Sequence, residues 1–210
     1  MLQWVYEAAS SSSSLERVIV ATDDERVFEQ ARLFGAEARM TSPAHASGTD
    51  RAAEVAAGLG SPIIVNIQGD EPLIRAEMID GLVAALQDED VPMASLMAGM
   101  TEREEVLDRN VVKVVVDKNG FALYFSRFPI PFGGDPPFFR HIGVYGYQRG
   151  FLLDLCGRPR TRLEEAEKLE QLRVLENGFR IKMVECRMPT LSVDAPEDII
   201  KVEKFLKKGP

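Results

Sequence analysis

The amino-acid sequence predicts an α/β sandwich with a mainly parallel sheet. Short apolar runs rich in β-branched residues alternate with segments of helical periodicity, and Gly, Asn or Pro signals separate them. A hydrophobic fraction of 45% over 210 residues is enough to bury a sizeable core without a disulfide framework. No break in composition divides the chain, so we expect a single domain over residues 1–210.

The first half of the chain repeats a strand-to-helix unit. Residues 17–21 (RVIVA) form a short β-branched run, and the next four residues, TDDE, fit a capping box for a helix that ends at Gly35. Residues 62–67 (PIIVNI) form an apolar run typical of a parallel strand covered on both faces. A helix over 76–86 and a strand over 92–97 follow. The first helix has apolar residues at helical spacing: Val27, Phe28, Ala31 and Phe34.

The middle of the chain departs from this order. Residues 111–116 and 121–125 are two β runs joined by a turn that contains Asn119-Gly120, a strong hairpin signal. After a loop rich in proline and glycine, residues 141–147 form another β run with aromatic side chains. We therefore expect an antiparallel lobe over about 111–147, inserted into the parallel order.

The last third returns to alternating helices and strands. We expect a helix over 163–175 that ends at Asn177-Gly178. A strand over 180–186 and a helix over 196–206 follow. The run Ser10–Ser14 is too short for a linker and is expected to be a loop.

Composition excludes several classes of protein. The 33 acidic and 25 basic residues give a net charge of −8, which repels nucleic acid. No apolar run approaches the roughly 20 residues that span a bilayer, so we expect no membrane insertion. Two cysteines and two histidines are too few for a dedicated zinc site or a disulfide framework. Without a signal peptide, we expect a cytoplasmic protein.

Polar residues directly after predicted strands are the first candidates for a site, because open α/β sheets bind ligands there. Asp70 follows the run 62–67 in Gln68-Gly69-Asp70, and Asp194 precedes the last predicted helix. If the two carboxylates meet in space, they suit Mg²⁺, which takes one or two carboxylates plus water and substrate oxygens. The alternative is that each aspartate only caps a helix.

A second candidate is the small-residue loop over 43–51, PAHASGTDR. Its amides and hydroxyls can read the polar edge of a base, and Arg51 can face a phosphate. The alternative is that Ser47 or Thr49 is a simple N-cap.

A third candidate lies in the β run 141–147. His141 and Tyr145 are i and i+4 on one strand, so we expect both on one face, about 13 Å apart, with Gly143 leaving a depression between them. A depression flanked by polar groups suits a polyhydroxylated sugar, whereas a structural histidine in the core is the alternative. The stretch 167–171 (EKLEQ) on the following helix would ordinarily be a solvated face.

Several stretches match one family in order along nearly the whole chain. They are RVIVATDD (17–24), HASGTDR (45–51), IVNIQGDEP (64–72), VVKVV (111–115), ALYFSR (122–127), RHIGVYGY (140–147), LEQLRVLENG (169–178) and VDAPED (193–198). On these motifs the chain resembles the 3-deoxy-D-manno-octulosonate cytidylyltransferases, the CMP-Kdo synthetases of lipopolysaccharide biosynthesis. The motif QGDEP is shared in looser form by other sugar nucleotidyltransferases, whereas RHIGVYGY with LEQLR is much narrower.

The resemblance implies a three-layer, Rossmann-like nucleotidyltransferase domain with an antiparallel dimerisation lobe, hence a homodimer. It implies that CTP and Kdo are the substrates, that Mg²⁺ is the cofactor, and that CMP transfer gives CMP-Kdo and pyrophosphate. By the same resemblance, Asp70 and Asp194 are the catalytic metal ligands. The residues implied in nucleotide binding are Ser47, Gly48, Arg51 and Gln68. The residues implied in sugar binding are Gln68, Arg127, His141, Tyr145, Glu170 and Gln171.

One departure from the family concerns the N-terminus. The family begins with a strand and a loop of the form P-A-R-x-x-S-T-R-x-P-G-K that grips the CTP triphosphate, and this motif is absent. Residues 1–5 line up instead with the helix after that loop. Because a missing central strand would expose unpaired edges, we expect that the sequence omits an N-terminal segment. The loop 132–138 is also shorter than in the family.

Two alternative functions stay open. One is a cytidylyltransferase for another acidic sugar such as a sialic acid. The other is an inactive homologue that binds a sugar or a nucleotide without turning it over.

Overall fold

The computed structural model describes residues 1–133, 138–187, 193 and 202 of the chain. These residues fall into two compact units, each of which is discontinuous in sequence. The first unit comprises residues 1–60 and 66–80 together with 193 and 202, and the second comprises 61–65 and the described part of 81–188. The sequence predicted no such division, and the two units are described separately below.

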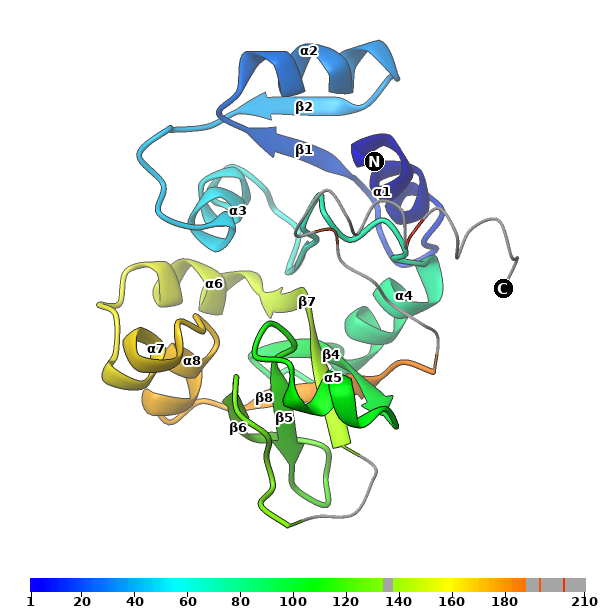
Figure 1. Cartoon of the computed structure of the whole chain (residues 1–210). Helices are drawn as coiled ribbons and strands as arrows, with labels where there is room; N and C mark the ends of the chain where they lie inside the picture. The colour runs from blue at the N-terminus through cyan, green and yellow to red at the C-terminus, as the bar shows by residue number, and fades with distance from the viewer. Residues whose placement is uncertain (134–137, 188–192, 194–201, 203–210) are drawn as a thin grey trace. The chain divides into compact units, whose positions relative to one another are not determined.

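The first unit contains a two-stranded parallel sheet. Strand β1 (Ile19–Thr22) pairs with β2 (Glu37–Met40), and α2 (Glu25–Leu33) packs against both (Figure 1). Helix α1 (Leu2–Ser10) contributes Leu2 and Tyr6 to the same core, where the Tyr6 and Phe34 rings lie 5.6 Å apart. The residues buried at its centre are Val20, Ala31 and Ala36.

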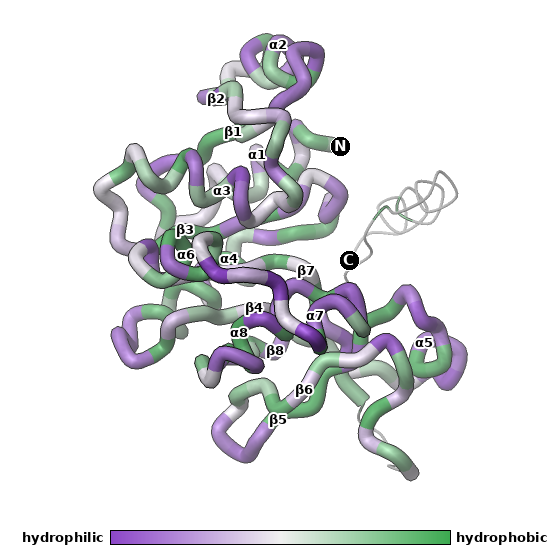
Figure 2. The backbone as a smooth tube through the Cα atoms, turned by 90° about the vertical axis from the view of Figure 1, so that its left-hand side faces the viewer, coloured by the Kyte–Doolittle hydropathy of each residue, from purple (hydrophilic) through white to green (hydrophobic). Residues whose placement is uncertain are grey.

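Helix α2 is amphipathic, as its alternating colours in Figure 2 show, but its cap differs from the prediction. Asp24, not Thr22, is the N-cap, because its carboxylate accepts the amide of Arg26 at 2.8 Å. The Thr22 hydroxyl accepts the amide of Asp24 instead, at 3.1 Å. The predicted stop at Gly35 is confirmed by its left-handed backbone at φ +82°.

The rest of the first unit carries α3 (Gly48–Ala57) and the start of α4 (Ala76–Ala85). The serine run is a loop tied to α4 through one carboxylate, as three contacts show. Asp80 accepts the Ser12 hydroxyl at 2.6 Å, the Ser13 hydroxyl at 3.4 Å and the Ser14 amide at 3.2 Å. These hydrogen bonds, led by that of Ser12, hold the pKa of Asp80 below its ordinary value.

The second unit is built on a six-stranded mixed sheet. Its strands run in the order β6-β5-β7-β4-β8, and β3 also pairs with β7. Among the described strands, β1–β2 and β4–β8 are parallel, whereas β4–β7, β5–β6 and β5–β7 are antiparallel. The α/β class is confirmed, but these pairings are mixed rather than mainly parallel. The bounds are β3 (Ile63–Asn66), β4 (Met93–Met100), β5 (Lys113–Val116), β6 (Ala122–Ser126), β7 (Phe138–Gln148) and β8 (Ile181–Glu185).

The predicted hairpin joins β5 to β6, with Gly120 at φ +76° in its turn. Its strands are continuous with the sheet, because β5 pairs with β7 and β7 pairs with β4. At the start of β5, Lys113 is fully buried. Its ammonium donates to the carbonyl oxygens of Asp108 at 2.7 Å and of Val111 and Arg127 at 2.6 Å, and burial lowers its pKa.

Five helices contribute to the second unit: the end of α4, α5 (Arg103–Leu107), α6 (Arg149–Cys156), α7 (Arg162–Glu167) and α8 (Leu172–Glu176). The single helix predicted over 163–175 is wrong, because the chain breaks at Lys168, which adopts the left-handed conformation at φ +55°. A buried ion pair joins α7 to α8, with Glu164 and Arg173 at 2.5 Å. Gly146, on β7, allows the side chain of Leu86 to approach the strand closely, because a Cβ on Gly146 would lie 2.6 Å from Leu86 Cδ1.

Two predictions fall at the edges of the described chain. The helix predicted over 196–206 lies outside the described residues except for Val202. Among the residues that are described, none of the helices is both long and apolar enough to cross a membrane. Cys156 and Cys186 are not joined in a disulfide, and burial raises the pKa of Cys186 to about 11.

Candidate active site

The predicted site residues form two groups, one in each unit. The first-unit cluster comprises Ser47, Gly48, Arg51, Gln68 and Asp70. The second-unit cluster comprises Arg127, His141, Tyr145, Glu170 and Gln171.

Ser47 is the N-cap of α3. Its hydroxyl accepts the Asp50 amide at 3.2 Å and donates to the Asp50 carboxylate at 3.0 Å. The structure therefore confirms the alternative that Ser47 is an N-cap. A helix N-terminus also favours anions, so a capping role and a place beside a phosphate are compatible.

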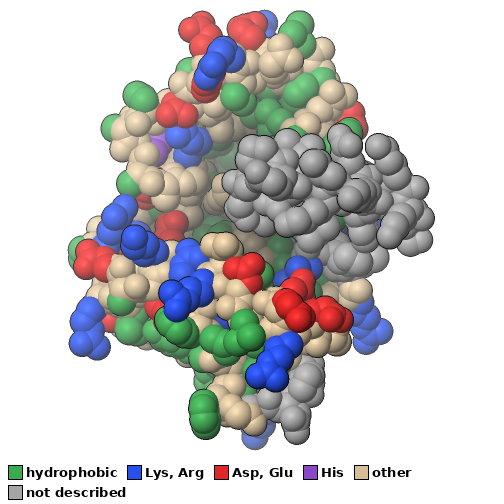
Figure 3. All heavy atoms as spheres, viewed as in Figure 1, with side chains coloured by type: hydrophobic (Ala, Val, Ile, Leu, Met, Phe, Trp, Pro, Cys, Tyr) green, Lys and Arg blue, Asp and Glu red, His purple; other side chains and the backbone are tan. Residues whose placement is uncertain are grey.

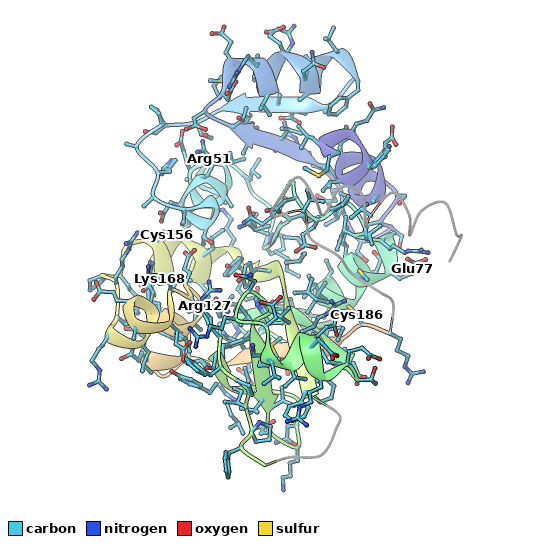
Figure 4. The ribbon with its side chains drawn as sticks, viewed as in Figure 1. Arg51, Glu77, Arg127, Cys156, Lys168 and Cys186 are labelled. Carbon is cyan, nitrogen blue, oxygen red and sulfur yellow. The ribbon has the colours of Figure 1, made fainter. Side chains whose placement is uncertain are left out.

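Two side chains of α3 organise the loop that precedes the helix. Arg51 (labelled in Figure 4) contacts the Thr41 hydroxyl and forms an ion pair with Asp23 at 3.0 Å. One turn along the helix, Glu54 accepts the Ser42 amide at 3.0 Å and contacts His45 Nε2. The Ser42 amide first, and then His45, hold the pKa of Glu54 below its ordinary value. The loop is thus shaped before any ligand arrives.

Gln68 lies against the start of α3. A Cβ built on Gly48 would be 2.8 Å from Gln68 Nε2 and 3.2 Å from Oε1, so the amide occupies the space that any other side chain would fill. This close approach explains why glycine follows Ser47 and brings two predicted nucleotide-binding residues together.

Asp70 follows Gln68 in a tight turn, where Glu71 donates its amide to the Gln68 carbonyl at 3.3 Å. The amide of Val193 donates to the Asp70 carbonyl at 2.9 Å. Asp194 is the next residue in the sequence and lies outside the described residues.

The donor chemistry of Asp70 and Asp194 fits magnesium. Within the described part of the chain, no cluster of three or more His, Cys, Asp or Glu side chains is arranged to hold a metal. A site built on two carboxylates does not need such a cluster, since Mg²⁺ retains water and takes substrate oxygens. The contact of Val193 with Asp70 supports this pair of ligands, which stays a prediction.

In the second-unit cluster, His141 and Tyr145 are much closer than expected. Their ring centroids lie 5.4 Å apart, so the prediction of about 13 Å with a depression between them is wrong. The reason is an irregularity in the β4–β7 pairing: Ser95 pairs with Tyr145 but Leu96 pairs with Ile142. The intervening residues bulge, and the strand contracts there.

His141 is enclosed by protein groups. Its Nε2 lies 2.8 Å from Ser95 Oγ, and its ring packs on Phe125 with centroids 5.1 Å apart. Burial lowers the pKa of His141 to about 3, so the ring is neutral at physiological pH. A neutral ring can donate a hydrogen bond from one nitrogen and accept one at the other.

Gln171 joins the two aromatic side chains. Its Nε2 is 3.5 Å from His141 Nδ1, and the Tyr145 hydroxyl is 3.5 Å from its Oε1. Because the chain breaks at Lys168, Glu170 and Gln171 lie between α7 and α8, where Gln171 is 4% exposed. The expectation of a solvated face is therefore wrong for Gln171.

Arg127 is engaged at this same break, close to Lys168 in Figure 4. Its guanidinium donates to the carbonyl oxygens of Glu167 at 2.9 Å, Arg109 at 3.2 Å and Lys168 at 3.5 Å. The Glu167 carboxylate in turn accepts the Arg127 amide and the Ser126 hydroxyl, both at 3.0 Å. Arg127 thus holds the bend that positions Gln171, and its contact with a sugar carboxylate stays a prediction.

The sequence reasoning missed two residues that support these clusters, Ser95 and Glu54. A hydroxyl inside the apolar run MASLM has to find a buried partner, and that signal was available for Ser95. Glu54 lies three residues after Arg51, on the same helix face, which was the signal for a shared role.

Comparisons with known proteins agree over most of the chain. The model of a family described as Cytidylyltransferase matches residues 1–183. A 3-deoxy-manno-octulosonate cytidylyltransferase from Solibacter usitatus is 52% identical over 99% of this chain and 84% of its own. One from Syntrophotalea carbinolica is 47% identical over 99% of this chain and 88% of its own.

Two solved structures are similar. One is CMP:2-keto-3-deoxy-manno-octonic acid synthetase complexed with CTP, with a TM-score of 0.93 and 37% identity over 100% of this chain and 88% of that one. The other is 4-diphosphocytidyl-2C-methyl-D-erythritol synthase from Anaerococcus prevotii, with a TM-score of 0.67 at 12% identity over 98% and 88%, which shows a shared fold. The chain therefore belongs to the cytidylyltransferases, and within them to the 3-deoxy-manno-octulosonate cytidylyltransferase family.

Proposed function

We propose that this enzyme transfers CMP from CTP to 3-deoxy-D-manno-octulosonate (Kdo), giving CMP-Kdo and pyrophosphate for lipopolysaccharide biosynthesis. The main support is that relatives 45–52% identical over 99–100% of this chain carry the name of that activity. Five of the eight motifs that carried the resemblance in sequence contain residues of the two clusters described above.

The reaction is a direct displacement at phosphorus. The anomeric hydroxyl of Kdo attacks the α-phosphorus of CTP, the bond to the β-phosphate oxygen breaks, pyrophosphate leaves, and the hydroxyl proton passes to solvent. The protein supplies positioning and charge compensation rather than a covalent intermediate. Bound Mg²⁺ would neutralise phosphate charge and lower the pKa of the attacking hydroxyl.

The first-unit cluster suits the nucleotide. Asp70 and Asp194 would hold the magnesium ion. The amides at the start of α3 and the Arg51 guanidinium attract anionic or polar groups, and the Gln68 amide both donates and accepts hydrogen bonds.

The second-unit cluster suits the sugar. His141, Tyr145 and Gln171 form a neutral group joined by hydrogen-bond contacts, and neutral donors and acceptors of this kind match a polyhydroxylated ligand. Glu170 adds a carboxylate for sugar hydroxyls, and Arg127 a cation for the sugar carboxylate.

Side-by-side turnover tests this function. Purified enzyme with CTP and Mg²⁺ should release pyrophosphate with Kdo and much more slowly with N-acetylneuraminate. Faster release with N-acetylneuraminate would assign the enzyme to sialic acid instead. No release with either sugar, from a protein whose intact mass is 23.3 kDa, would identify an inactive homologue.

We further propose a cytoplasmic homodimer. Cys156 and Cys186 are not joined in a disulfide, which suits a reducing compartment. Hydrophobic side chains gather over β6 and the loop after it (Figure 3), including exposed Leu123, Phe128 and Phe132. Exposed apolar surface of this kind marks an interface. Light scattering at micromolar concentration should give twice the monomer mass, and an active monomer would disprove the dimer.

A further inference from the structure

Ser95 contacts His141 of the second-unit cluster, although the sequence assigned it no role. It is on β4, has no exposed surface, and sits where the β4–β7 pairing is irregular. Its hydroxyl is 2.9 Å from the Val144 carbonyl oxygen, 3.3 Å from that of Ile142 and 2.8 Å from His141 Nε2.

These three contacts determine which way the hydrogen bonds run. A serine hydroxyl has one proton and two lone pairs, whereas a carbonyl oxygen can only accept. If the Ser95 proton pointed to His141, two carbonyl oxygens would face the serine oxygen with no proton between them. Ser95 therefore donates to a carbonyl, principally that of Val144, and accepts a hydrogen bond from His141.

The direction of the Ser95 hydrogen bonds determines the tautomer of the His141 imidazole. His141 must carry its proton on Nε2, because that nitrogen donates to Ser95 Oγ. Its Nδ1 is then an acceptor. Gln171 Nε2, at 3.5 Å, is the donor that faces it.

The tautomer of His141 also sets the orientation of the Gln171 amide, which contacts Tyr145. With its amide nitrogen toward His141, Gln171 presents Oε1 to the Tyr145 hydroxyl at 3.5 Å. The Tyr145 hydroxyl then donates its proton to Gln171 Oε1. Both Gln171 contacts are long and therefore weak. The shorter hydrogen bonds of Ser95 are therefore the ones that set the direction of the whole network.

We propose that Ser95 is a positioning residue for sugar binding: it sets the Nε2-protonated tautomer of His141 and, through Gln171, directs the Tyr145 hydroxyl toward Gln171 Oε1. The sugar part of this inference rests on the proposed function. The tautomer part does not, because it follows from protein groups alone.

Nitrogen NMR of the enzyme labelled with ¹⁵N-histidine tests the tautomer directly. The chain has only two histidines, so a His45→Gln variant assigns the His141 signals. At neutral pH we expect a protonated, pyrrole-type Nε2 and an unprotonated, pyridine-type Nδ1. A proton on Nδ1, or on both nitrogens, would overturn the proposal without any substrate being present.

Two substitutions test the consequence for binding. Ser95→Ala removes the acceptor, so we expect a mixture of tautomers and a rise of about tenfold in the KM for Kdo, with the KM for CTP changed less than twofold. Ser95→Thr keeps the hydroxyl and should keep both the tautomer and the KM values. Loss of the tautomer in Ser95→Thr, or unchanged KM values in folded Ser95→Ala, would contradict the positioning role.

A matched control separates positioning from stability. Leu155→Ala makes a cavity under a buried side chain of α6 and lowers the melting temperature without touching His141. It should leave the His141 tautomer and both KM values unchanged. If it raises the KM for Kdo as Ser95→Ala does, the effect is one of stability and the proposal fails. If the wild-type enzyme shows the expected tautomer but does not use Kdo, the proposed substrate is wrong while the assignment of Ser95 to His141 stands.

Discussion

The two groups of predicted site residues are held by opposite kinds of interaction. In the first unit, partly exposed pairs that contain charged side chains shape the loop before α3: Arg51 with Asp23, and Glu54 with His45. In the second unit, a neutral network of Ser95, His141 and Gln171 lies inside the protein.

This difference matches the chemistry proposed for each side. A triphosphate carries charge and is bound by charge, which salt screens at the surface. A polyol is bound by correctly directed neutral donors and acceptors, which salt barely affects but protonation destroys. The comparison predicts that substitutions in the first unit are sensitive to charge, and that those in the second are sensitive to hydrogen-bond direction.

The largest effect is expected at Asp70, where charge should matter most. Asp70→Asn keeps the shape of the side chain but removes the ligand charge, so we expect kcat to fall by about 1,000-fold with an unchanged melting temperature. Asp194→Asn should behave alike. The exposed residue Asp90 provides the control Asp90→Asn, which should be silent. Wild-type turnover in Asp70→Asn would show that Asp70 only forms the turn. It would contradict the prediction that charge determines function in the first unit.

Lys113 sharpens the comparison because it is a buried cation in the unit that holds the neutral network. Lys113→Met leaves three carbonyl oxygens without their donor, and we expect a loss of about 3 kcal/mol in the free energy of unfolding. Urea denaturation measures this loss, with the exposed Lys118→Met as the control. Equal stability of the two variants would show that water replaces the ammonium, and that this part of the unit is not dry.

The pH dependence of stability tests whether His141 is neutral. Its pKa is about 3 when folded and about 6.5 when unfolded, so below pH 6.5 the unfolded chain binds a proton that the folded chain does not. The wild type should therefore lose about 2 kcal/mol more than His141→Gln between pH 7 and pH 5, while the two proteins run parallel above pH 7. Denaturation at each pH measures this, and identical slopes would mean that His141 is open to protons.

The smallest effect is expected at Glu54. Glu54→Gln keeps an acceptor for the Ser42 amide but removes the charge beside His45, so we expect the KM for CTP to rise about fivefold at low salt and less at high salt. The KM for Kdo should not change. The control is Glu29→Gln, which removes a more exposed ion pair with Arg32 on α2. A rise in the KM for both substrates would contradict the separation of charged and neutral sides.

Many of the strands and helices were predictable because local patterns determine them, although β2, α5 and α6 were not predicted. The turns at Gly35, Gly120 and Gly178 all have the positive φ that their positions suggested. The cap of α2 was misplaced because TDDE offers three possible capping side chains, and the Arg26 amide bonds to the third, Asp24.

What the sequence could not show depends on partners far along the chain. Lys168 has no intrinsic preference for a left-handed backbone, and its bend is held by Arg127, about 40 residues earlier. The contraction between His141 and Tyr145 arises from pairing with β4, so the 5.4 Å separation of the rings followed from no local pattern. Family motifs located both clusters, but not the residues that orient them.

The serine loop shows how little is needed to order a segment whose composition favours flexibility. Three of its polar groups depend on one carboxylate 66 to 68 residues away, on a helix made later in synthesis. The serine loop is therefore ordered only when α4 is docked against it, and it loses that order when α4 separates from it. The rate at which a protease cleaves between α1 and β1 would thus depend on whether α4 is docked, although the protease does not contact α4. Cleavage there would detect local opening before global unfolding.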